Sequence, residues 1–405
     1  MPMARIIMHI DLNAFFVRCE EIKNPALEGK PVLIGHEGRS GIVSTASYAA
    51  RKMGCHSGQP MFQATKCCPE AIIIAPDFHF YHLMSTAFYA FLTQYSRIIE
   101  MASVDECYVD MTKALKDVED PETYLRNLQN KLFQETKLRC SIGIAPTKWL
   151  AKMASDMKKP MGLVFLRKRD IPTLVYPLPI ESFWGIGKKT SPKLRAMGIN
   201  TIADLAAFLK KEDQALHFFG KFYYEIKNWI EGTSNDVVYT EYDDPKSISA
   251  SSTLMEDADN EASVAPMILS LAEEVSSRAK AQGLVGKTIT LQVKEAEYDE
   301  KRNSFKLHNK SISSRDGTNE AEEIYEKCLA LYRENFLGLP IRLVGVSLNK
   351  LINPKKETVQ MSLWNYEQYE EMDKTKLLIS ELNRKMDSPM LLRASDIKKG
   401  KKNGK

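Results

Sequence analysis

The chain has 405 residues, of which 44% are hydrophobic and 27% are charged, and its formal net charge is only +4. This composition is typical of a globular protein with several cores. No run of about 18 apolar residues predicts a membrane span, and the N-terminus does not resemble a signal peptide. The seven cysteines form no CxxC pair, so we expect reduced thiols in a cytoplasmic protein and not a disulfide scaffold.

The first 166 residues mix strand and helix patterns. Strands are expected at 5–12, 31–35, 41–46, 101–111 and 139–145. Helices are expected at 14–23, from Ser47 onward, at 82–97 and at 121–137. A turn-like sequence, residues 103–106, interrupts the fourth strand. This mixture predicts an α/β or α+β domain.

The rest of the chain divides into a strand-poor part and a second α+β part. Residues 167–232 predict short amphipathic helices, and the polar stretch 233–246 predicts a linker. Further strands are expected at 247–255, 288–296, 304–312 and 341–351, with helices at 261–282 and 319–336. Their order, β-α-β-β-α-β, resembles a ferredoxin-like split unit. The strongly basic C-terminus predicts a solvated tail.

Three carboxylates stand where predicted strands end. Asp11 ends the first strand, while Asp105 and Glu106 lie in the turn near residue 105. Buried carboxylates are costly unless they are paired, hydrogen-bonded or bound to a metal, and hard oxygen ligands suit Mg²⁺. Two such ions about 3.5–4 Å apart would stabilise the attacking and leaving oxygens of a phosphoryl transfer. The alternative is that Asp11 caps a helix and that Asp105 and Glu106 only form a turn.

Four motifs surround these carboxylates in a fixed order. They are IDLNAFF at 10–16, STASYAARKMG at 44–54, SVDECYVD at 103–110 and SIGIAPTKWLAKMASDMKKPMG at 141–162. Together they resemble the motifs of the Y-family DNA polymerases, most closely those of the bacterial DinB (DNA polymerase IV) branch. The resemblance implies an α+β multidomain fold, in which a polymerase right hand of palm, fingers and thumb is followed by a ferredoxin-like little finger domain.

The resemblance also implies domain boundaries. These are 1–18 and 75–166 for the palm, 19–74 for the fingers, 167–232 for a helical thumb with a helix-hairpin-helix, 233–246 for a linker, 247–351 for the little finger and 352–405 for a C-terminal tail.

The same resemblance assigns the catalytic residues. Asp11, Asp105 and Glu106 would bind two Mg²⁺ ions, with the backbone carbonyl of Leu12 completing one shell. The reaction would be attack of a primer 3′-hydroxyl on the α-phosphate of a dNTP, without proofreading. Asn13 stands where the family often carries a second Asp, so we do not expect it to be a ligand. The activity implied is low-fidelity translesion synthesis on primer-template DNA by a monomer, in the cytoplasm at the bacterial nucleoid.

Contacts to the nucleotide are implied by residues that match the family's motifs. Thr45, Tyr48 and Arg51 match a triphosphate-binding set, and Lys159 matches a further cation. A hydroxyl, a phenol and a guanidinium at i, i+3 and i+6 lie near one face of a helix start, where anions are favoured. Phe16 matches the steric gate, whose ring excludes a ribose 2′-hydroxyl.

Four neighbouring positions complete this set. Phe15 is either a further nucleotide contact or a core aromatic. Val32 and Ile42 match residues that cover the nascent base pair, and aliphatic residues there would leave a roomy, poorly discriminating site. Lys148 and Lys152 lie four residues apart on a helix, so we expect them on a solvated or DNA-facing edge.

Two regions predict contacts with DNA. GIGKKTSPKLRAMGI at 185–199 resembles a helix-hairpin-helix, in which glycine backbone N–H groups approach phosphates and lysines add charge; the residues are Gly185, Gly187, Lys188, Lys189 and Lys193. In the Ser-rich strand that begins at residue 247, Ser249 and Ser251 are expected to contact phosphates. The alternative for them is an edge strand with a polar face.

The peptide QMSLW at 360–364 resembles the segment with which bacterial polymerases bind the β sliding clamp. Gln360 would hydrogen-bond, and Leu363 and Trp364 would fill an apolar pocket. Alternatively, the last two residues dock on their own chain, near a predicted helix at 366–386.

Two other functions were weighed against a polymerase. A nucleotide cyclase with a similar palm would not need the hairpin or the clamp peptide. A non-catalytic DNA-binding scaffold would not need to keep Asp11, Asp105 and Glu106. The sequence therefore favours the polymerase.

Overall fold

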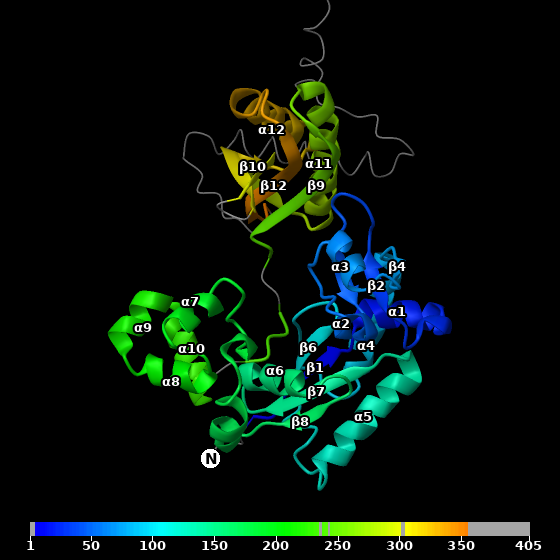
Figure 1. The fold of residues 1–405 in the computed structure, drawn as a ribbon, viewed down its shortest axis with the longest axis vertical. Coiled ribbons are helices and arrows are strands. Elements are labelled where there is room, and N and C mark those ends of the chain that lie inside the picture. Colours follow the sequence, from blue (N-terminus) through cyan, green and yellow to red (C-terminus); the bar gives the residue numbers. More distant parts are fainter. Residues whose placement is uncertain (1–4, 235–236, 242–243, 301–303, 355–405) are drawn as a thin grey trace, which may run out of the picture. The chain divides into compact units, whose positions relative to one another are not determined.

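The computed structural model describes residues 5–234, 237–241, 244–300 and 304–354 (Figure 1). The chain divides into two compact units, Met1–Asp243 and Asp244–Lys405. The division falls within the stretch 233–246, where a linker was expected. Among the described residues, we find no helix with the length and apolar character needed to cross a membrane.

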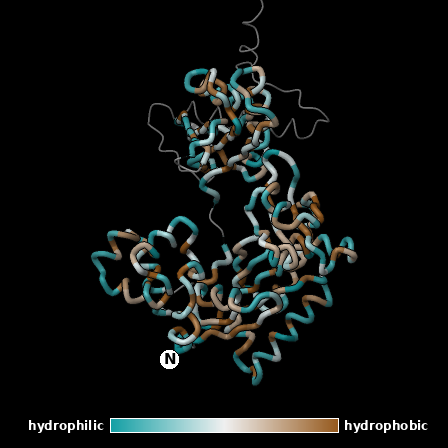
Figure 2. The backbone as a smooth tube through the Cα atoms, viewed as in Figure 1, coloured by the Kyte–Doolittle hydropathy of each residue, from teal (hydrophilic) through white to brown (hydrophobic). Residues whose placement is uncertain are grey.

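A five-stranded sheet forms the centre of the first unit. Its order is β5 (Ile99–Met101), β6 (Glu106–Asp110), β1 (Ile7–Leu12), β7 (Cys140–Ala145) and β8 (Leu163–Phe165). The helices of this region are α1 (Phe15–Lys23), α4 (Phe78–Leu92), α5 (Pro121–Thr136) and α6 (Lys148–Met157). Hydrophobic and hydrophilic turns alternate along α5 in Figure 2, because one side of this helix packs on the core and the other faces solvent.

The central strand β1 is buried along its whole length, and its alternation decides what each side of the sheet receives. Met8, Ile10 and Leu12 point into a core that includes α4 and α5. Ile7 points the opposite way, into a core built with α6 and the helices that follow it. His9 and Asp11 share the parity of Ile7. Period-2 geometry therefore directs two polar side chains toward α6.

A three-stranded sheet with its own small core follows in the chain. Its order is β3 (Val43–Ala46), β2 (Val32–Gly35) and β4 (Ile72–Ile74), and it packs with α2 (Tyr48–Lys52) and α3 (Met61–Cys67). Ser47 caps α2, since its hydroxyl accepts from the N–H of Ala50 at 3.2 Å and from that of Val32 at 2.9 Å. The sequence pattern missed β4 and α3, which are short and lack period-2 or 3.6-residue alternation.

The strand-poor region is helical, as expected. It contains α7 (Ser191–Ala196), α8 (Ile202–Leu209), α9 (Glu212–Phe219) and α10 (Phe222–Glu231). Short 3₁₀ turns occur at Pro25–Leu27, Lys168–Asp170 and Ile180–Ser182, and a π-helical turn at Ile171–Val175. Helices α7 to α10 share one hydrophobic core with α6, so this region packs onto the five-stranded sheet through α6.

The second unit has the predicted element order. It comprises β9 (Ser247–Ala258), α11 (Glu261–Ala281), β10 (Val285–Asp299), β11 (Ser304–Thr318), α12 (Ala321–Asn335) and β12 (Ile341–Ile352). The sheet order is β11-β10-β12-β9, and every neighbouring pair is antiparallel. Each helix thus joins two parallel strands that have one strand between them, which makes two interleaved split βαβ units. Element order predicted these units but not that β10 and β12 would lie at the centre.

Candidate active site

Asp11 and Glu106 meet across two neighbouring strands. β1 and β6 are antiparallel, and Asp11 lies directly opposite Glu106 in their register. Just beyond this pair, the N–H of Leu12 donates to the carbonyl of Asp105 at 2.9 Å. Residues far apart in sequence are therefore brought together by strand pairing, which the sequence pattern alone could not establish.

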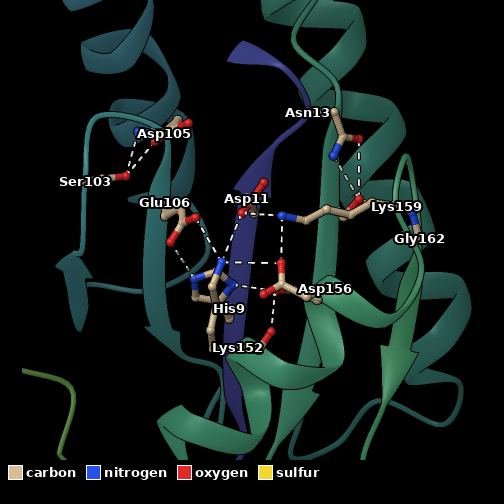
Figure 3. A network of polar contacts seen from close by, with 12 residues as sticks. His9, Asp11, Asn13, Ser103, Asp105, Glu106, Lys152, Asp156, Lys159 and Gly162 are labelled. Carbon is tan, nitrogen blue, oxygen red and sulfur yellow. Dashed lines mark hydrogen bonds and ion pairs between the residues drawn. The ribbon is translucent and has the colours of Figure 1, made fainter. Parts of the chain in front are cut away.

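Two lysines form ion pairs with these carboxylates (Figure 3). Lys152 Nζ lies 2.9 Å from Glu106 Oε1 and 3.3 Å from Asp11 Oδ2, and Lys159 Nζ lies 2.7 Å from Asp11 Oδ2. Asp156 joins both lysines, with its Oδ1 at 2.8 Å from Lys159 Nζ and 3.4 Å from Lys152 Nζ. Lys152 and Asp156 lie one turn apart on α6, and Lys159 follows two residues after that helix ends at Met157.

The expectation of a solvated or DNA-facing edge for Lys148 and Lys152 is wrong. Lys152 is buried among carboxylates, and its side chain is only 8% exposed. Lys148 pairs with both oxygens of Glu100, at 3.1 and 3.0 Å. Helical spacing suggested that the two lysines share a face, but only the strand under α6 decides that this face is covered.

His9 lies next to the Glu106 carboxylate. It was not identified from the sequence. Its ring is fully buried, with Nδ1 at 2.8 Å from the hydroxyl of Ser155 and Nε2 at 3.4 Å from Glu106 Oε2. Burial lowers the pKa of His9, so the ring is neutral near pH 7. A histidine two residues before Asp11, on the same side of a buried strand, is the sequence signal that could have revealed it.

The carboxylates of Asp11 and Glu106 lie so close that they would repel each other without a nearby positive charge. Burial and the contact with Glu106 raise the pKa of Asp11 to about 7. Burial also opposes ionisation of Glu106, but the neighbouring His9 and Asp11 and the charge of Lys152 outweigh it and lower the pKa of Glu106. Burial likewise opposes the charge of Lys152, and the surrounding Asp11, Asp156 and Glu106 overcome it and raise its pKa. The site therefore attracts cations.

Asp105 does not face this pair. Its Oδ1 accepts from the hydroxyl of Ser103 at 2.6 Å, within a turn that Ser85 holds through the carbonyl of Val104 at 2.6 Å. Burial raises the pKa of Asp105. Within the described residues, no group of three or more His, Cys, Asp or Glu side chains is arranged to hold a metal ion. The structure thus brings the side chains of Asp11 and Glu106 together. The side chain of Asp105, the third predicted ligand, contacts Ser103 instead.

The chemistry of the donors nevertheless fits a hard divalent cation. Asp11 and Glu106 offer carboxylate oxygens side by side, and the ammonium groups of Lys152 and Lys159 already lie on those oxygens. Asn13 has structural partners instead: its amide donates to Ser141 Oγ at 2.9 Å and its Oδ1 accepts from the N–H of Met161 at 2.8 Å. These contacts explain how an amide is accommodated at that position.

The predicted triphosphate residues lie on β3 and α2. Thr45 is half-buried on β3, and Tyr48 begins α2. The Arg51 guanidinium lies over the Tyr48 ring at 5.0 Å, and its Nε donates to the carbonyl of Ala46 at 2.9 Å. Burial raises the pKa of Tyr48, and the charges of Arg51, Lys159 and Asp11 also act on it. Tyr48 lines one cavity with Asn13 and Met161, which stand two residues after Asp11 and Lys159, respectively.

Phe15 and Phe16 have different surroundings. Phe15 is buried in the core, which removes its ring from contact with a nucleotide and agrees with the alternative of a core aromatic. Phe16 is half-buried and stacks on Tyr81, with ring centroids 4.4 Å apart and planes 14° apart. The Tyr81 hydroxyl donates to the buried Glu20 carboxylate at 2.8 Å. The predicted gate is thus backed by an anchored ring.

The two predicted base-covering residues differ in exposure. Val32 is fully buried in the core beside α1. Its role at the base pair stays a prediction. Ile42 is 55% exposed, just before β3, and remains available for such a contact.

The hairpin before α7 has the geometry that its glycines suggested. Gly185 has φ of +109°, and an added Cβ would lie 3.2 Å from the Trp229 ring. The carbonyl of Gly187 accepts from Thr190 and Ser191 at the start of α7. The three predicted lysines are exposed: Lys188, Lys189 and Lys193. The hairpin is therefore fixed by packing while its basic side chains face solvent.

The four-stranded sheet has a polar side opposite its helices. Ile248 and Ala250 of β9 point into the core, so Ser249 and Ser251 point outward. They line a groove of about 490 Å³ whose other walls are formed mainly by hydroxyl and amide side chains: Thr288, Thr290, Gln292, Asn309, Ser311, Ser347 and Asn349. Neighbouring strands hydrogen-bond through these groups, as Thr290 and Ser311 do at 2.8 Å.

Gln360, Leu363 and Trp364 of the predicted clamp peptide lie outside the described residues.

Comparison with known proteins identifies this arrangement. Residues 10–156 match the impB/mucB/samB family, residues 245–363 match its C-terminal domain, and residues 168–199 match the HHH motif of the same family. DNA polymerase IV of Oceanobacillus iheyensis is 35% identical over 390 residues, covering 96% of this chain and 91% of that protein. DNA polymerase IV 1 of Bacillus subtilis is 34% identical over 399 residues, covering 98% and 94%.

Solved structures confirm the fold class. A Y-family DNA polymerase chimera of Dbh and Dpo4 has a TM-score of 0.75 at 24% identity, covering 86% of this chain and 99% of its own. An insertion ternary complex of Dbh DNA polymerase has a TM-score of 0.57 with the same coverage. The chain therefore belongs to the Y-family of DNA polymerases, in the impB/mucB/samB group that includes the DNA polymerase IV proteins.

Proposed function

We propose that this chain is a DNA-directed DNA polymerase that adds dNMP units to a primer 3′-hydroxyl during low-fidelity translesion synthesis, without proofreading. The observation that carries the proposal is the buried pair Asp11–Glu106, opposite each other on β1 and β6 and already covered by ammonium groups. The relatives named DNA polymerase IV, which match nearly the whole chain, support this function over a cyclase or a non-catalytic scaffold.

Y-family polymerases are metal-dependent nucleotidyltransferases, and we propose two Mg²⁺ ions here. Asp11 and Glu106, the backbone carbonyl of Leu12, and Asp105 after its side chain leaves Ser103 would hold them. Bound Mg²⁺ would lower the pKa of the primer hydroxyl and neutralise charge on the phosphates. His9 and Lys152 hold the two oxygens of Glu106 from below, so this carboxylate needs little reorganisation.

The nucleotide would be oriented by groups on either side of this pair. Thr45, Tyr48, Arg51 and Lys159 would bind the triphosphate, and the contact of Arg51 with Tyr48 supports a prepared site on α2. Phe16 would exclude a 2′-hydroxyl because Tyr81 prevents its ring from retreating. Val32 and Ile42 would cover the nascent base pair, and their aliphatic side chains favour a permissive site.

DNA would be held independently of its sequence. The backbone at Gly185 and Gly187 and the exposed lysines of the hairpin would contact phosphates on one part of the duplex. The polar side of the four-stranded sheet, including Ser249 and Ser251, would contact phosphates through neutral donors. Neutral hydroxyl and amide groups on the sheet and exposed lysines on the hairpin both suit contacts with phosphates.

We further propose that Gln360, Leu363 and Trp364 bind a β sliding clamp and that the enzyme is a monomer acting at the nucleoid. Deletion of residues 360–364 should abolish stimulation by added clamp while basal extension persists. Loss of both activities together would contradict this assignment.

Primer extension tests the central proposal. Wild-type protein should extend a labelled primer with Mg²⁺ and dNTPs on undamaged and abasic templates, whereas Asp105→Ala/Glu106→Ala should not. Asp117→Ala is a matched control, since Asp117 is an exposed carboxylate outside the site. The proposal fails if wild-type protein does not extend the primer or if the double variant extends it fully.

A further inference from the structure

Lys159 stands between two carboxylates at the edge of the site. Its Nζ lies 2.7 Å from Asp11 Oδ2 and 2.8 Å from Asp156 Oδ1 (Figure 3). Asp11 is almost completely buried, with a side chain 8% exposed, while the Asp156 side chain is 45% exposed. Lys159 therefore links the interior of the carboxylate site to its surface.

In the proposed function, Asp11 binds a metal ion and Lys159 binds the triphosphate. These partners exclude the contact between Asp11 and Lys159. Asp11 Oδ2 already accepts from both Lys159 and Lys152, so a metal ion bound to that oxygen must displace at least one ammonium. A lysine that binds the triphosphate, in turn, cannot remain fully engaged with Asp11. The ion pair seen here thus belongs to the state before nucleotide binds.

The two lysines differ in their freedom to leave. The Lys152 side chain is 8% exposed and also holds Glu106 at 2.9 Å, from the middle of α6. The Lys159 side chain is 25% exposed. Lys159 follows two residues after Met157, where α6 ends. Asp156 remains beside Lys159 whether or not Asp11 is occupied, because it lies only three residues earlier, in the last turn of α6.

We propose that a cation exchange takes place at Asp11: Lys159 occupies this carboxylate in the nucleotide-free enzyme and moves to the triphosphate as the metal-bound nucleotide enters. This inference rests on the proposed function. Asp11 exchanges an ammonium for a metal ion, and Lys159 exchanges a carboxylate for a phosphate, so no charge is left buried without a partner. Asp156 keeps the ammonium near the site during the transfer.

The exchange makes metal and nucleotide binding interdependent. Without nucleotide, Lys159 competes with a metal ion for Asp11 and weakens metal binding. With nucleotide, the same lysine is withdrawn to the phosphates, and the competition disappears. By linkage, the metal must strengthen nucleotide binding by the same factor. A lysine that served only as a phosphate contact would leave metal affinity in the nucleotide-free enzyme unchanged.

The test measures Mn²⁺ binding to full-length protein by the electron paramagnetic resonance of free Mn²⁺, without DNA. In Lys159→Met, the affinity without nucleotide should rise by about five- to tenfold, in the range of ordinary coupling between sites. The further gain on adding a non-hydrolysable dNTP should shrink. Lys158→Met is the matched control, because it removes a neighbouring exposed charge and should leave both values near those of wild type. Lys159→Gln repeats the test with a different side chain, and melting curves verify folding.

Asp11→Asn separates failure of the exchange from failure of the proposed site. If Asp11→Asn loses Mn²⁺ affinity while Lys159→Met binds as wild type does, the exchange is wrong and the carboxylate site stands. If Asp11→Asn binds Mn²⁺ as well as wild type does, the assignment of the metal site itself is wrong. A rise of equal size in Lys158→Met would reduce the effect to general electrostatics and would also overturn the exchange.

Discussion

The two larger sheets of this protein display polar groups in opposite ways. At the five-stranded sheet, Asp11 of β1 and Lys152 of α6 are buried and paired at short range. On the four-stranded sheet, exposed neutral side chains form cross-strand pairs such as Thr290 with Ser311. Charges in a desolvated site interact strongly and depend on one another, whereas exposed dipoles contribute little individually. The difference teaches that the chemistry is concentrated in a few coupled groups, while the proposed grip on DNA is distributed.

The largest effect should follow from removing the buried ammonium. Lys152→Met leaves Asp11 and Glu106 without their shared partner, which should lower the free energy of unfolding of the metal-free protein by about 3–5 kcal/mol at pH 8. The loss should be smaller at pH 6 than at pH 8, because burial raises the pKa of Asp11 to about 7 and protonation of Asp11 removes the charge that Lys152 balances in the wild-type protein. Urea denaturation measures both values. Lys350→Met, on the groove of the four-stranded sheet, should cost less than about 0.5 kcal/mol. Equal losses would remove the contrast between the sheets.

Sugar selection should be the next largest effect. Phe16→Ala removes the half-buried ring that stacks on Tyr81, so discrimination between dNTP and rNTP should fall by about 100-fold. Single-nucleotide incorporation with matched dNTP and rNTP measures the ratio of kcat/KM values. Phe78→Ala provides the comparison, because this exposed ring contacts Phe16 edge-on at 6.0 Å and is not the proposed gate. Unchanged selectivity in Phe16→Ala would withdraw the role of gate.

The polar side of the four-stranded sheet should respond to added charge more than to lost hydroxyls. Ser249→Asp/Ser251→Asp should weaken binding of primer-template DNA by about tenfold at low salt, because two negative charges would then face phosphates. Ser249→Ala should change affinity by less than about threefold. Fluorescence anisotropy measures both. Ser263→Asp, on the exposed start of α11, is the control. If all three variants bind alike, this surface does not contact DNA.

The smallest effect concerns the pH dependence of stability. Burial lowers the pKa of His9 below its ordinary value of 6.5, so below that pH the unfolded chain takes up a proton that the folded protein does not. Stability is therefore fully present above pH 6.5 and is lost as the pH falls, by at most about 1.4 kcal/mol per pH unit. His9→Gln should flatten the slope between pH 5.5 and 6.5 in denaturant titrations. An unaltered slope would mean that His9 titrates normally in the folded state.

The sequence by itself determined much of this protein. Four ordered motifs were enough to predict the polymerase fold class, which the solved structures confirm. The alternation around Asp11 predicted a buried strand, and the serine at 47 predicted a helix start, because strand parity and capping are local properties of the chain. The element order of the second unit followed from periodicity for the same reason.

Only the tertiary structure decided which charged groups are buried together. Lys152 reads as a surface residue until β1 is placed beneath α6, and the burial of Val32 depends on the core that packs beside α1. His9 and Asp156 gain their roles from register and from the end of a helix, respectively. Burial is a property of what packs against a residue, and contacts between distant segments are not encoded in local pattern. The residues that set the electrostatics of the site were therefore visible only in the folded chain.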